Sequence, residues 1–107
     1  MHSHLFDRIA EATDRARMAS SGRALEDAVQ QFIEVLQCVP DYPLASLPPE
    51  SLRIVRARAD EVIASIERWV DSHSDQDYRE RRLVERVYDI RRSLEYIHRW
   101  CRHAAHA

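Results

Sequence analysis

The chain has 107 residues and is expected to form a single domain over residues 1–107. Its residues are 45% hydrophobic and 32% charged, a balance that excludes a disordered chain and allows a buried core. The sequence contains one glycine, which leaves few positions for the positive-φ turns of hairpins, so the composition favours helices over sheets.

Four segments repeat apolar residues at alternating spacings of three and four. This spacing places the apolar residues of each segment on one face of an α-helix. The average spacing of about 3.5 residues is typical of left-handed bundle packing. The sequence therefore predicts an all-α antiparallel four-helix bundle. The four segments are Leu5–Ala19, Leu25–Val39, Leu52–Trp69 and Leu83–Ala104.

The breaks between these segments differ in strength. Ser20, Ser21 and Gly22 separate the first two, and Gly22 is expected at the C′ position just past the first helix. All four prolines lie between the second and third segments, and Pro49 is expected to begin the third helix. The first break is the weakest, because a glycine inside a helix costs only about 1 kcal/mol. The alternative is three long helices that complete their core by dimerising.

Bulk properties bound the compartment and the partners. The first five residues lack a basic segment followed by an apolar run, so no secretory signal is expected. Two cysteines are too few for a disulfide framework, which favours a cytoplasmic protein with reduced thiols. The absence of lysine and asparagine indicates a GC-rich coding sequence, as in many bacteria. A net charge of −2 argues against membranes or nucleic acid as non-specific partners.

The last segment carries aromatic and arginine side chains opposite its apolar face. Tyrosine, tryptophan and arginine are enriched at interaction hot spots, although arginine stems packed on tyrosine rings can also cover a helix that has no partner. We expect a non-catalytic interaction or assembly module that binds a protein partner or a second copy of itself as a homodimer. RNA is a weaker alternative, because these side chains could also stack on bases. The predicted contact residues are Tyr88, Arg92, Tyr96, Arg99 and Trp100.

Arginine and histidine also lie near each other on this segment. Arg92-x5-His98 and Arg91-x6-His98 both resemble the Arg-x(4–6)-His motif of HEPN-family ribonucleases, which are small all-helical proteins. Histidine can transfer a proton near neutral pH and arginine can hold a phosphate. The resemblance implies a toxin-type ribonuclease that uses His98 with Arg91 or Arg92. The residue after the arginine, Arg92 or Ser93, departs from the asparagine or aspartate common in that family.

Histidine and cysteine are expected to gather at one end of the bundle. In an up-down-up-down arrangement, the start of the first helix and the ends of the second and fourth lie together. Imidazole and thiolate are ligands of zinc, but no CxxC or HExxH spacing supports a metal site. We therefore expect no metal. We also expect no cofactor, since one glycine cannot form a phosphate-binding loop. The alternative metal ligands are His98, Cys101, His103 and Cys38.

Overall fold

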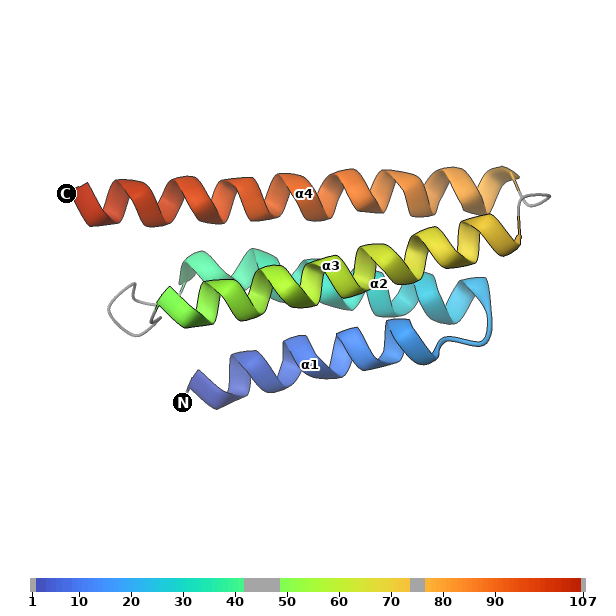
Figure 1. Ribbon diagram of the computed structural model, residues 1–107, viewed down its shortest axis with the longest axis horizontal. Helices are drawn as coiled ribbons and strands as arrows, with labels where there is room; N and C mark the ends of the chain where they lie inside the picture. The colour runs from blue at the N-terminus through green and yellow to red at the C-terminus, as the bar shows by residue number, and fades with distance from the viewer. Residues whose placement is uncertain (1, 42–48, 74–76, 107) are drawn as a thin grey trace.

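The computed structural model describes residues 2–41, 49–73 and 77–106, with side chains described over 4–41, 50–73 and 81–101. Across these residues the chain forms four α-helices, one short 3-10 helix and no strand, which confirms the predicted all-α four-helix fold (Figure 1). The helices are α1 (His2–Met18), α2 (Gly22–Cys38), α3 (Pro49–Ser72) and α4 (Asp77–His106), and the 3-10 helix η1 (Val39–Asp41) follows α2.

Successive helices run in opposite directions along a bundle that is 49 Å long (Figure 1). Helix α1 packs against α2 and α3, and α4 packs against the same two helices from the other side. Helices α1 and α4 therefore lie at opposite corners of the bundle, with one face of α4 turned away from the other helices (Figure 1). The start of α1 and the ends of α2 and α4 lie at the same end, as the predicted topology requires.

The boundary between α1 and α2 corrects two expectations. Helix α1 ends at Met18 and α2 begins at Gly22, so one long first helix is wrong. Gly22 is also not at a C′ position, because it is the buried first residue of α2 and does not have a positive φ. The boundary depends on Ser21 instead. Its Oγ accepts a hydrogen bond from the Ala24 N–H at 3.1 Å and so caps one of the free amides of the first turn.

Pro49 is the first residue of α3, as the sequence predicts. A proline fits there because the first amides of a helix have no carbonyl partner within the helix. Of the other prolines, Pro40 lies in η1, whereas Pro43 and Pro48 lie outside the described residues. Pro49 therefore occupies a position at which a helix tolerates proline, whereas a proline in the interior of α3 would disrupt the helix.

The predicted apolar faces meet in one hydrophobic cluster that draws on all four helices. Helix α2 is the most deeply packed, with Leu25, Val29, Phe32 and Leu36 almost completely buried. The face of α4 is packed less deeply, since Val87, Leu94 and Cys101 are half-buried at its edges. Full burial of one large apolar side chain contributes about 1.5–3 kcal/mol to the stability of the fold. Because α2 carries these deeply buried side chains, it is the centre of the core.

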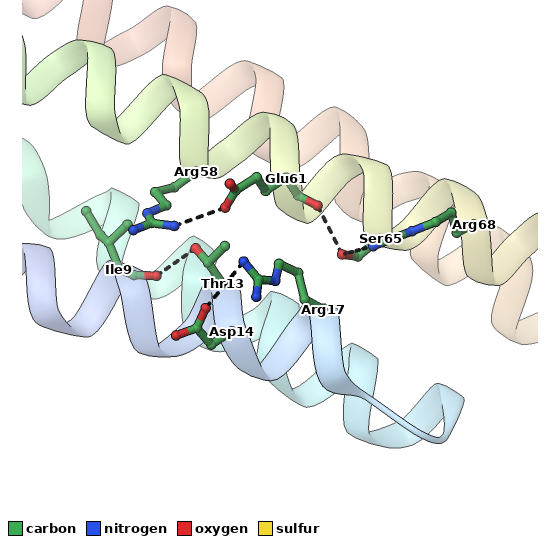
Figure 2. A network of polar contacts seen from close by, with 8 residues as sticks. All are labelled: Ile9, Thr13, Asp14, Arg17, Arg58, Glu61, Ser65 and Arg68. Carbon is green, nitrogen blue, oxygen red and sulfur yellow. Dashed lines mark hydrogen bonds and ion pairs between the residues drawn. The ribbon is translucent and has the colours of Figure 1, made fainter.

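Polar side chains where α1 faces α3 are satisfied within their own helices (Figure 2). The buried Thr13 hydroxyl donates to the Ile9 carbonyl at 2.7 Å, and the Ser65 hydroxyl donates to the Glu61 carbonyl at 3.0 Å. Arg58 pairs with Glu61 along α3 at 3.1 Å. Because these bonds run along each helix, the contact between α1 and α3 depends on side-chain packing.

Candidate interaction surface

The part of α4 that turns away from α2 and α3 is here named the α4 outer face. Its residues are all solvent-exposed, and α4 presents them along one side because its opposite side is held in the core through Leu83, Ile90 and Ile97. Tyr88 is 61% exposed on this face. The α4 outer face consists of Arg81, Val84, Glu85, Tyr88, Arg91, Arg92, Glu95 and Arg99.

On the α2 side, the outer face borders a groove between α2 and α4 of about 470 Å³. Arg92 and Tyr96 line it, together with Gln30 and Ile33 of α2. Tyr96 is 61% exposed, so it is available to a partner beside this groove. Trp100 differs from the other predicted contact residues, because it is half-buried and packs against the core.

On the α3 side, Tyr88 borders a smaller hollow of about 270 Å³ between α3 and α4. Aliphatic side chains line part of it, with Ile66 and Val70 from α3 and Val84 from α4, and the charged Glu67, Asp71 and Arg91 line the rest. Val84 lies one turn before Tyr88 and is 41% exposed. Tyr88 and Val84 therefore form an apolar patch at the centre of the α4 outer face.

The structure separates the two arginines of the candidate nuclease motif. Arg91 and His98 line the same groove of about 580 Å³ between α3 and α4. Arg92 instead lines the groove on the α2 side with Tyr96. Arg56 and three carboxylates, those of Asp60, Glu67 and Glu95, also line the groove that holds Arg91 and His98. The carboxylates outnumber the two arginines, and their negative charge disfavours a phosphate chain in that groove.

Some charges of α4 are already paired within the chain. Arg99 pairs with Glu95 at 2.9 Å, and Arg82 reaches Glu26 on α2 at 3.6 Å. Within the part of the chain that the structure describes, the side chains of Arg81, Glu85, Arg91 and Arg92 take part in no ion pair. These four exposed charges are therefore free to contact a partner.

The histidine and cysteine side chains that are described differ in their exposure. Cys38 and Cys101 are both free thiols and half-buried, while His98 is exposed beside α3. Burial raises the pKa of the Cys101 thiol, which stays protonated near neutral pH. No group of three or more His, Cys, Asp and Glu among the described side chains is arranged to hold a metal, and the side chain of His103 is outside that set.

Sequence reasoning missed the contribution of Val84 and of the α3 residues beside it. The signal for Val84 was present, because it lies four residues before Tyr88 and outside the predicted apolar face.

Within the described residues, no helix is apolar over a length that could cross a membrane. In the comparisons with known proteins, no protein family, no curated protein and no solved structure matches this chain.

Proposed function

We propose that this chain is a non-catalytic interaction module that binds a protein partner through the α4 outer face and the adjoining Tyr96. The single observation that carries the proposal is the pair of tyrosines, each 61% exposed, on a helix whose other side is fixed in the core. Tyrosine and arginine are the side chains that contribute most at the centres of protein interfaces. Cytoplasmic action is part of the same proposal.

The contact would work by docking of a rigid helix face. A tyrosine ring buries a large area while restricting few rotatable bonds, so Tyr88 and Tyr96 serve as anchors. Arg92 and Arg99 have planar guanidinium groups that can hold a carboxylate with two hydrogen bonds. Trp100 is half-buried and packs against the core beside this surface. The partner that such tyrosine and arginine side chains would bind is a protein surface with an apolar patch bordered by carboxylates.

Capture of binding proteins by the immobilised chain tests this function. We expect Tyr96→Ala and Arg92→Ala to lose captured partners or self-association while their melting temperatures stay close to that of the parent. Ile54→Ala is the matched control, because Ile54 is an exposed apolar side chain on α3, 48% exposed. The proposal fails when both α4 variants capture the same proteins and sediment like the parent.

A second candidate, a ribonuclease that resembles the HEPN family, is favoured by one observation. Arg91 and His98 line one groove, where histidine could transfer a proton and arginine could hold a phosphate. In this candidate Arg91 acts with His98, since Arg92 lines the other groove. An RNA-cleavage assay with the parent and His98→Ala decides it. Loss of cleavage in the variant supports the candidate, and no cleavage by either protein removes it.

A further inference from the structure

We infer that one partner of the α4 outer face is a second copy of this chain, which docks antiparallel with a two-fold axis at Tyr88. The inference rests on the proposed function, because it names a partner for the same surface. It is carried by the placement of charges on either side of Tyr88. These charges match when the face meets itself in the opposite direction.

The spacing of residues on this face follows the two-turn period of a helix. Arg81, Tyr88 and Glu95 succeed one another at intervals of seven residues, and so do Glu85 and Arg92. Seven residues are nearly two turns, so each set forms a row along the exposed side of α4. Arg81 and Glu95 are equally distant from Tyr88 in opposite directions. Glu85 and Arg92 lie three and four residues from it.

A two-fold axis perpendicular to α4 at Tyr88 converts this spacing into contacts between two copies. Tyr88 then faces Tyr88 of the second copy, with Val84 of each copy beside it. Arg81 faces Glu95 of the second copy, and Glu85 faces Arg92 of the second copy. Because the axis is two-fold, each of these opposite-charge contacts occurs twice. The result is an apolar centre with a charged rim, as in other protein interfaces.

The groups needed for these contacts are exposed and largely uncommitted. Arg81, Glu85 and Arg92 are exposed and form no ion pair within the described residues. Glu95 contacts Arg99 through Oε1 only, so its Oε2 is available to Arg81 of the second copy. The contact from Arg81 to Glu95 extends over roughly 21 Å of helix, at 1.5 Å per residue.

Charge also selects the direction of docking. In a parallel pair in register, Arg81 would face Arg81 and Arg92 would face Arg92, and like charges across an interface repel. The antiparallel pair replaces each of these contacts with an attraction. Closed two-fold dimers are also the most frequent symmetric assemblies of soluble proteins.

Sedimentation equilibrium of the full chain over a range of concentrations tests this dimer. Arg81→Glu and Glu95→Arg each place like charges opposite one another twice, and each should raise the dimer Kd by about tenfold. The double variant, Arg81→Glu with Glu95→Arg, exchanges the two charges and should return Kd to within about threefold of the parent. Arg53→Glu makes the same charge change on an exposed position of α3 and should leave Kd unchanged.

Cross-linking at the axis gives a second readout of the same geometry. Tyr88→Cys, in a background with Cys38→Ser and Cys101→Ala, brings a thiol next to its own copy, where mild oxidation should join the two chains. A thiol introduced by Arg53→Cys in this background should stay monomeric. Disulfide formation requires Cβ atoms about 3.5–4.5 Å apart, so it reports the axis closely.

The outcomes separate this inference from the proposed function. Single variants that weaken the dimer without recovery in the double variant overturn the antiparallel register. A dimer whose Kd is the same in the charge variants as in the parent overturns both the register and the use of this face for self-association. A chain that stays monomeric overturns the second-copy inference alone, because loss of another captured protein in Tyr96→Ala would still support the α4 surface.

Discussion

At the scale of single residues, Ser21 fixes where α2 begins. Its Oγ accepts the Ala24 N–H, and removal of that oxygen leaves an amide of the first turn without its partner. We expect Ser21→Ala to lower the free energy of unfolding by about 1 kcal/mol. Urea denaturation followed by circular dichroism measures the change. Ser20→Ala, at the exposed neighbouring serine, should stay within about 0.5 kcal/mol of the parent, and equal losses in both would contradict the cap.

The Cys101 thiol makes the free energy of unfolding depend on pH in a direction that its burial sets. Burial raises its pKa above the ordinary value of 9.0, so the folded chain keeps the proton to higher pH than the unfolded chain does. Stability is unaffected below pH 9.0 and falls as the pH rises through the folded pKa, since the unfolded state then binds fewer protons. Urea unfolding at pH values below and above 9.0 should show a larger loss for the parent than for Cys101→Ala. Equal losses in the two proteins would contradict this effect.

At the scale of helices, the small side chains of α1 set its distance from the rest of the bundle. Ala12 is completely buried and Ala16 nearly so, on the side of α1 that faces α2 and α3. Leucine at position 12 would force these helices apart, so Ala12→Leu should destabilise the fold by about 1–3 kcal/mol. Ala57→Leu is the matched control, because Ala57 is exposed on α3 and leucine is a good helix former. Thermal unfolding of both variants compares them directly, and a control as destabilised as Ala12→Leu would contradict this account.

The helices were predictable because their signal is local. Every apolar position predicted for α2, from Leu25 to Val39, is buried, since spacing alone fixes which side chains share a helix face. Gly22 was misplaced because glycine is common at helix boundaries in general, and only the path of the chain sets whether its φ is positive. Ser21 carries the stronger signal there, because serine at an N-cap has a specific hydrogen-bonding role.

The candidate surface was predictable only in part, because its edges depend on neighbouring helices. The exposure of Tyr88 and Tyr96 followed from their place opposite the apolar face of α4. Neighbouring residues on a helix point about 100° apart, so Arg91 and Arg92 border different grooves once α2 and α3 are placed. Spacing on α4 places Trp100 at the edge of its apolar face, and the structure has it half-buried against the core there.

At the scale of the whole molecule, the charges divide between opposite sides of the bundle. Residues 1–50 carry four arginines and eight acids, whereas residues 75–107 carry eight arginines and six acids. Because α1 and α4 lie at opposite corners, this difference cannot be neutralised by direct contact between those two helices. Opposite charges do meet between α2 and α4, where Arg82 forms an ion pair with Glu26. Arg81, Arg91 and Arg92 of α4 form no ion pair within the described residues and are left for contacts outside the chain.

Ionic strength should therefore act on self-association and on folding to different extents. Most ion pairs described within the chain join residues three or four positions apart on one helix that are exposed or half-buried, and such pairs contribute about 0.5 kcal/mol each. The core supplies the stability, so the urea midpoint at low protein concentration should change little between about 50 and 500 mM NaCl. The dimer Kd should rise several-fold over the same range, because its rim depends on charge contacts between copies. Sedimentation and urea unfolding on the same samples measure both quantities, and a dimer that tightens with salt would mean that apolar contact alone holds it.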